Sequence, residues 1–196
     1  MKVIGITGGV GCGKSAVLSE LEKEYNCIVL VADMAAKELE KKGQKAYLEL
    51  VELLGDRILS DDGEIDKNLM AQRIFENPDL LNAVNGIIHP AVKEYILEKI
   101  DEAEKKGDVD YFFLEAALLI ECGYMEIVDE MWYIYTVEEV RRQRLKKQRD
   151  YSDEKIDSIM KNQLSEEEFK NNCTFVIDNS YSLDQTMETI RKHLIN

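Results

Sequence analysis

Residues 8–15 read Gly-Gly-Val-Gly-Cys-Gly-Lys-Ser, and this stretch is the strongest indication of the fold in the sequence. It satisfies the Walker A pattern, in which a glycine and any four residues precede Gly-Lys-Ser. Glycines let the backbone curl so that N–H groups point inward, and the next helix adds the positive end of its dipole. An apolar run over 3–6 precedes the stretch, and a helical pattern follows over about 14–25. A glycine-rich turn without a ligand would not need these flanks, so we predict a phosphate-binding P-loop.

Two side chains of the loop have predicted roles at a bound nucleotide. Lys14 is expected to reach the β- and γ-phosphates of ATP, and the hydroxyl of Ser15 to bind Mg²⁺. Cys12 lies near a helix N-terminus, where a thiolate is favoured and open to oxidation. The alternative, which we prefer, is that position 12 only requires a small residue.

Four more apolar runs predict further strands, and helical patterns separate them. The runs cover 27–31, 111–114, 131–135 and 175–177. Continuous apolar strands between helices indicate a parallel sheet with both faces covered, an α/β fold. Ligands of such folds bind at the carboxyl ends of the strands. The P-loop, Asp33 and Glu115 all fall at such ends.

The long stretch between the second and third strands is too long for one crossover helix. Helical patterns cover 35–41, 45–54, 67–75 and 78–106, and the turn 60–63 separates two of them. We predict a helical insert over about 35–107 that receives a second substrate. The remaining core then covers about 1–34, 108–140 and 173–196. His89-Pro90 is interpreted as a helix boundary, because proline restricts the residue before it.

Two carboxylates at predicted strand ends are candidates for catalysis. A kinase needs a carboxylate that positions the hydroxyl nucleophile and accepts its proton, and Asp33 has the position for this. The alternative for Asp33 is the N-cap of the next helix, and the two roles are compatible. Glu115 resembles the acidic residue of a Walker B strand, which binds Mg²⁺ directly or through water. Its alternative is also to cap a following helix.

The chain is acidic, with 39 acidic residues against 25 basic ones and a net charge of −14. Nonspecific nucleic-acid binding needs a basic face, so we expect no nucleic-acid partner. Six of the nine residues 141–149 are nevertheless basic. They predict a mobile lid over about 141–165 that closes over ATP and supplies positive charge to the transition state. The alternative is a solvated helix face with Glu138 and Glu139 as partners.

The composition also bears on compartment and metal content. No apolar run approaches the roughly 20 residues that cross a bilayer, and the first apolar run ends too soon for a signal peptide. The four cysteines are scattered and only two histidines occur, which argues against a zinc site or a disulfide framework. We expect a soluble, cytoplasmic protein without a membrane partner, either a monomer or a small homo-oligomer.

Several short segments, spread over nearly all of the chain, resemble the motifs of one protein family. Their joint occurrence is a more specific sign of that family than any single segment. They are 4–9 before the P-loop, Ala32-Asp33 with Ala36-Lys37, His89-Pro90, 118–121, 163–165 and 176–179. In this order they resemble the dephospho-CoA kinase family. The resemblance implies a three-layer P-loop NTPase fold of the nucleoside-monophosphate-kinase type, with an acceptor-binding insert and a lid. It also implies phosphorylation of the ribose 3′-hydroxyl of dephospho-CoA by ATP, the last step of coenzyme A biosynthesis.

The resemblance extends to individual residues. It implies Asp33 as the base that activates the 3′-hydroxyl and His89 as a residue of the acceptor pocket, and it puts Thr7 near that hydroxyl. It assigns Arg144 and Arg149 to the lid. The residues expected to hold ATP are Gly8, Gly9, Gly11, Cys12, Gly13, Lys14, Ser15 and Ala16, and those expected to contact the acceptor are Thr7, Asp33, His89 and Glu115. The chain departs from the family pattern at Val31, Lys37, Ala117, Gln148 and Ile159.

Two other functions compete with this one. Another nucleotide kinase of the same core would offer arginines rather than a lone acid near Asp33. A switch GTPase would need a guanine-reading Asn-Lys-x-Asp element, and none occurs in the sequence.

Overall fold

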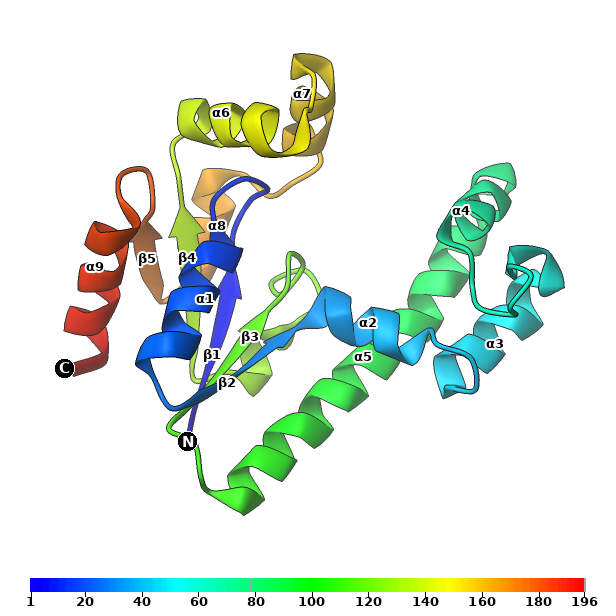
Figure 1. Ribbon diagram of the computed structural model, residues 1–196, viewed down its shortest axis with the longest axis horizontal. Coiled ribbons are helices and arrows are strands. Elements are labelled where there is room, and N and C mark those ends of the chain that lie inside the picture. Colours follow the sequence, from blue (N-terminus) through cyan, green and yellow to red (C-terminus); the bar gives the residue numbers. More distant parts are fainter. Residues whose placement is uncertain (78, 196) are drawn as a thin grey trace. The chain divides into compact units, whose positions relative to one another are not determined.

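The apolar run before the P-loop forms the central strand of a five-stranded sheet with the order β2-β3-β1-β4-β5 (Figure 1). The computed structural model describes residues 1–77 and 79–195, without the side chain of Glu76. The strands are β1 (Lys2–Thr7), β2 (Cys27–Val31), β3 (Tyr111–Glu115), β4 (Glu130–Tyr135) and β5 (Phe175–Asp178). Every predicted strand is therefore present.

The register brings the carboxyl ends of the strands to one edge of the sheet. β1 pairs in parallel with β3, where Ile6 lies opposite Glu115, and with β4, where Thr7 lies opposite Tyr133. β4 pairs in parallel with β5. The predicted parallel α/β fold is thus confirmed, and the P-loop follows β1 at the same edge as Glu115.

The chain divides into two compact units, which are described separately: residues 1–29 with 103–196, and residues 30–102. In the first unit, fully buried side chains such as Ile4, Phe113 and Trp132 form the core around the sheet. Its helices are α1 (Lys14–Glu24), the 3₁₀ helix η2 (Tyr124–Ile127), α6 (Glu138–Arg149), α7 (Asp153–Lys161), α8 (Glu166–Asn172) and α9 (Leu183–Ile195). α1 packs against α9, and Phe169 of α8 stacks on Tyr133 of β4.

The second unit has a small core of its own. Leu50, Leu54, Ile58 and Val84 are buried together, so apolar spacing along separate helices produces one cluster. Its helices are α2 (Ala32–Leu39), α3 (Lys45–Leu54), the 3₁₀ helix η1 (Asp56–Ile58), α4 (Lys67–Glu76) and the part of α5 (Asp79–Lys106) that precedes residue 103. The insert predicted from helical patterning is therefore helical, as expected.

The helix boundary predicted at His89-Pro90 is wrong, because α5 continues through it. Pro90 cannot donate to the carbonyl of Gly86, which costs one helical hydrogen bond. Gly86 is exposed, so water can reach that carbonyl. Buried side chains on both sides, Val84 before and Val92 after, hold the helix to its neighbours. Tertiary packing outweighs the local cost here. The predicted start of this helix at residue 78 lies outside the described residues.

One other helix limit differs from the prediction. α2 begins at Ala32 rather than at residue 35. Within the predicted lid, α7 ends at Lys161 and α8 follows it. Ser165 caps α8 in a capping box with Glu168, a serine and a glutamate three residues apart that the sequence shows openly.

A polar cluster at the amino ends of the strands ties the C-terminal helix to the sheet. Glu130 accepts hydrogen bonds from Lys2 and from Trp132 Nε1 (2.7 Å), and it lies 2.8 Å from His193 Nε2 of α9. Burial alone would raise the pKa of Glu130, but these three partners outweigh it and lower the pKa to about 2. The imidazole of His193 stacks on Phe175. The charged carboxylate therefore stabilises the folded state.

We expect the Glu130→Gln variant to be less stable near neutral pH. The folded pKa of about 2 is below the ordinary value of 4.5, so this stabilisation is complete above pH 4.5 and is lost as the pH falls through 2. The loss at pH 7 should be about 1 kcal/mol, because the carboxylate is partly solvated. Urea unfolding at pH 7 and pH 3 measures it, with Glu188→Gln on the exposed face of α9 as the control. An equal loss of unfolding free energy at pH 7 and pH 3 would contradict the assignment of this stabilisation to the charged carboxylate of Glu130.

Candidate active site

The backbone of the P-loop adopts conformations that require glycine. Gly11 and Gly13 have positive φ values of 77° and 93°. Gly8 has φ 149°, and a Cβ on it would lie 2.6 Å from the carbonyl oxygen of Ile134. Gly13 is the N-cap of α1, and no side chain caps the helix there. The N–H of Ala16 donates to the carbonyl of Gly13 at 3.1 Å. In general a helix N-terminus presents N–H groups without an i−4 acceptor, which is the arrangement that binds a phosphate.

The ammonium group of Lys14 lies at the mouth of this loop. Its Nζ donates a hydrogen bond to the carbonyl oxygen of Gly8 at 2.7 Å and lies 3.5 Å from Glu115 Oε1. Both side chains are largely buried, at 14% and 13% exposure. Glu115 is followed by turns rather than by a helix, so the helix-cap alternative for it is wrong. The structure brings Lys14 and Glu115 together, as expected for two groups at neighbouring strand ends.

Three other predicted residues lie in the loop or directly beside it. Thr7 is fully buried, and its Oγ1 has no hydrogen-bond partner among the described residues. Such a hydroxyl is costly unless a ligand or water completes it, which agrees with a place beside the substrates. Ser15 and Ala16 lie in the first turn of α1 and are exposed, so the Ser15 hydroxyl is accessible to a bound ion.

The carbonyl oxygen of Cys12 joins the loop to the rest of the unit. It accepts hydrogen bonds from Asn179 Nδ2 (2.8 Å), Thr136 Oγ1 (3.0 Å) and Arg144 Nη1 (3.3 Å). Arg144 also donates to the carbonyl of Asn179 at 2.8 Å. Thr136 was missed in the sequence, although a polar residue directly after a buried strand is a usable signal. Asn179 entered only through the family resemblance.

The thiol of Cys12 does not have the character expected of a helix N-terminus. Its side chain is only 1% exposed, and burial raises its pKa in spite of the opposing charges of Lys14 and Arg141. The favoured thiolate, the less preferred of our two interpretations of Cys12, is therefore wrong. Desolvation of the charged form is the larger effect, because the side chain points beneath the loop, where it would touch a Cβ at Gly8.

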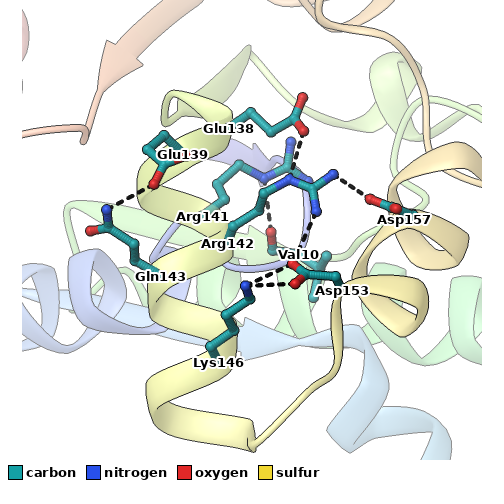
Figure 2. A network of polar contacts seen from close by, with 9 residues as sticks. All are labelled: Val10, Glu138, Glu139, Arg141, Arg142, Gln143, Lys146, Asp153 and Asp157. Carbon is teal, nitrogen blue, oxygen red and sulfur yellow. Dashed lines mark hydrogen bonds and ion pairs between the residues drawn. The ribbon is translucent and has the colours of Figure 1, made fainter.

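The basic stretch of α6 divides into two faces. On the outer face, Arg142 pairs with Glu138 and Asp157, and Lys146 pairs with Asp153 of α7 (Figure 2). This confirms the alternative of a solvated face for that part of the stretch. Arg141 and Arg144, three residues apart, turn toward the P-loop instead. Arg149 is exposed at the end of α6, and its guanidinium lies 6.0 Å from the ring of Tyr151.

Asp33 and His89 lie in the second unit. Asp33 is exposed in the first turn of α2, whose N-cap is Val31, so the N-cap alternative for Asp33 is wrong. His89 lies within α5 and is exposed. Their predicted roles at an acceptor stay predictions, as do those of the lid arginines.

The family model and the curated relatives carry the name of one enzyme. The family model described as dephospho-CoA kinase matches residues 2–185. A dephospho-CoA kinase of Carboxydothermus hydrogenoformans is 34% identical over 97% of this chain and 91% of its own length. One of Oceanobacillus iheyensis is 36% identical over 94% of this chain and 92% of its own. A solved structure from Thermus thermophilus has a TM-score of 0.81 and 27% identity, and the match covers 99% of this chain and 96% of that one.

We expect Cys12 to react slowly with iodoacetamide in the folded protein. Its raised pKa leaves little thiolate at pH 8, and burial denies the reagent access. Labelling at pH 8, followed by peptide mass spectrometry, should give a rate at least about tenfold below that of the chain unfolded in urea. Equal rates in the two states would show an accessible, activated thiol instead.

Proposed function

The chain belongs to the dephospho-CoA kinase family, and we propose that it transfers the γ-phosphoryl group of ATP to the ribose 3′-hydroxyl of dephospho-CoA, which yields CoA and ADP. The observation that carries this proposal is the P-loop geometry within a match that covers nearly the whole chain. Members of this kinase family use ATP as the phosphoryl donor.

The loop can stabilise the charge that develops during transfer. Phosphoryl transfer depends on positioning and on positive charge around the transferred group rather than on covalent chemistry. Lys14 supplies an ammonium group whose present partners are a carbonyl oxygen and Glu115. The N-terminus of α1 supplies N–H groups and the positive end of the helix dipole. We assign the lid arginines, Arg144 and Arg149, to the same task.

Mg²⁺ is proposed as the metal of this reaction, and the residues present fit it. Mg²⁺ usually takes one or two protein oxygens together with phosphate oxygens and water, rather than a full protein cage. Ser15 offers an exposed hydroxyl in the first turn of α1, and Glu115 offers a carboxylate near Lys14. The bound ion would neutralise phosphate charge. No cage of three or more His, Cys, Asp or Glu occurs among the described residues.

Asp33 is proposed as the general base on the acceptor side. A carboxylate must lie within hydrogen-bond reach of the hydroxyl whose proton it accepts. Asp33 is exposed in the first turn of α2. The helical unit that contains it, with His89, is proposed to bind dephospho-CoA.

The partners of this reaction are small molecules. No helix in the described ranges is long and apolar enough to cross a membrane. We propose that the enzyme acts in the cytoplasm as a monomer or a small homo-oligomer and does not bind nucleic acid. The acidic net charge of −14 supports the absence of a nucleic-acid partner. The cysteines form no disulfide among the described residues, which agrees with the cytoplasm.

An acceptor assay tests the proposed function. The protein is mixed with ATP, Mg²⁺ and dephospho-CoA, and ADP and CoA are separated by chromatography; AMP, UMP and shikimate serve as alternative acceptors. We expect CoA formation, with Lys14→Met slower by about 10²–10³-fold because a charge on the transferred group is lost. A well-folded protein that forms ADP with another acceptor but no CoA would refute the proposal.

Asp33→Asn should slow turnover by about 10²–10⁴-fold, because the amide cannot accept the proton of the hydroxyl. The dissociation constant for ATP, measured by calorimetry, should change by less than about twofold. Asp61→Asn, an exposed aspartate in the turn of the same unit, serves as the matched control and should keep wild-type turnover. Wild-type turnover in Asp33→Asn would remove Asp33 from the mechanism.

A further inference from the structure

Both the backbone N–H and the backbone carbonyl of Val10, at the tip of the P-loop, form hydrogen bonds with side chains outside the loop. The N–H of Val10 donates to Gln163 Oε1 at 3.1 Å. The carbonyl of Val10 accepts from Arg141 Nε at 2.9 Å (Figure 2). Arg141 Nη2 donates to the same Gln163 Oε1 at 3.0 Å. Val10, Arg141 and Gln163 thus form a closed ring of hydrogen bonds, which we call the loop clasp.

The members of the loop clasp come from three separate parts of the sequence. Val10 follows β1, Arg141 lies near the start of α6, and Gln163 lies between α7 and α8. The clasp therefore links the P-loop to both ends of the predicted lid. In the sequence, Arg141 is one of six cations in the basic stretch, and Gln163 belongs to a segment that resembles the kinase family. Neither side chain therefore has a predicted role of its own.

The glycines of the loop make room for this contact. A Cβ on Gly9 would overlap the guanidinium of Arg141, and one on Gly11 would lie 3.0 Å from Leu145 Cγ. Gly9 has no positive φ, so its backbone conformation does not demand glycine. The missing side chain instead leaves room for the guanidinium of Arg141, which fits the loop clasp.

The donors of Arg141 are directed at the protein rather than outward. Nε and Nη2 are both engaged with the loop and with Gln163, and the side chain is half-buried. Arg142, the next residue, instead forms exposed pairs with carboxylates, which contribute little to stability. The planar fork of Arg141 holds the Val10 carbonyl through Nε and Gln163 Oε1 through Nη2, which fixes the position of the Val10 peptide.

We propose that Arg141 and Gln163 are positioning residues that hold the P-loop tip in its phosphate-binding shape and thereby set the affinity for ATP. A loop ordered before ATP arrives does not lose conformational freedom on binding, which improves affinity without any new contact. The inference rests on the proposed function for the identity of the nucleotide. It assigns these two residues an effect on ATP and none on the acceptor.

Gln163→Met tests the acceptor atom of the loop clasp. Methionine keeps the length of the side chain and removes the oxygen that accepts both hydrogen bonds. We expect the dissociation constant and the KM for ATP to rise about tenfold, for the loss of two hydrogen bonds at one atom. The KM for dephospho-CoA should stay within about twofold and kcat within about threefold. Gln143→Met, which removes an exposed hydrogen bond to Glu139, is the matched control.

Arg141→Lys tests the other side of the loop clasp and keeps the charge. Lysine cannot reach two acceptors with a planar fork, so ATP affinity should again fall about tenfold. Arg142→Lys is its control on the outer face of α6. The double variant Arg141→Lys/Gln163→Met should bind ATP no more weakly than the weaker single variant, because both side chains act through the Val10 peptide. If Gln163→Met does not fold, Arg141→Lys decides the proposal alone.

Two outcomes would overturn the proposal. One is an ATP affinity of folded Gln163→Met within twofold of Gln143→Met. The other is a general structural effect, with a lowered melting temperature and equal losses of affinity for ATP and for the acceptor. Calorimetry with ATP and Mg²⁺ needs no acceptor, so it tests the effect of the loop clasp on ATP affinity even if the wild-type protein forms no CoA. That last result would contradict the proposed function instead.

Discussion

The carbonyl oxygen of Cys12 accepts hydrogen bonds from Thr136, Asn179 and Arg144, and the arrangement of the whole site depends on it. These donors stand after β4, after β5 and on α6, so one atom of the loop connects three elements that are distant in sequence. Asn179 is itself held by Thr186 Oγ1 of α9 at 2.8 Å. Buried polar groups need partners, and displacement of the loop would leave several of them unpaired at once. The direction of α1 and the position of Lys14 follow from this connection.

The two arginines of α6 that face the loop have neutral partners, whereas the cations of α6 that face away from it have acidic ones. Arg141 and Arg144 donate to oxygens of Val10, Gln163, Cys12, Thr136 and Asn179, none of which carries a charge. Arg142 and Lys146 instead pair with carboxylates. Hydrogen bonds to neutral oxygens orient a guanidinium without cancelling its charge. A chain with a net charge of −14 can therefore keep positive potential at one place, where phosphates bind.

Predictions from sequence patterns were correct where tertiary packing does not oppose the local conformational preference of the chain. The five strands, the glycine conformations of the P-loop and the meeting of Lys14 with Glu115 all follow from sterics and from parallel connectivity. They failed where packing opposes the local rule. Pro90 should end a helix but does not, because apolar contacts on both sides outweigh one hydrogen bond. At Cys12 the helix N-terminus favours a thiolate, but burial beneath the loop raises the pKa of the thiol, which agrees with our preferred interpretation of a position that only requires a small residue.

The sequence alone was enough to predict a parallel α/β protein with a phosphate-binding loop, and its ordered motifs indicated one kinase family. Which cations contact the loop became evident only from the folded structure. Arg141 and Arg142 are neighbours of the same type, and nothing in a list of residues separates them. The phase of α6 above the loop turns Arg141 toward Val10 and Arg142 toward Asp157. That phase is set by contacts such as Leu145 against Gly11, which join residues more than a hundred positions apart and leave no local signal.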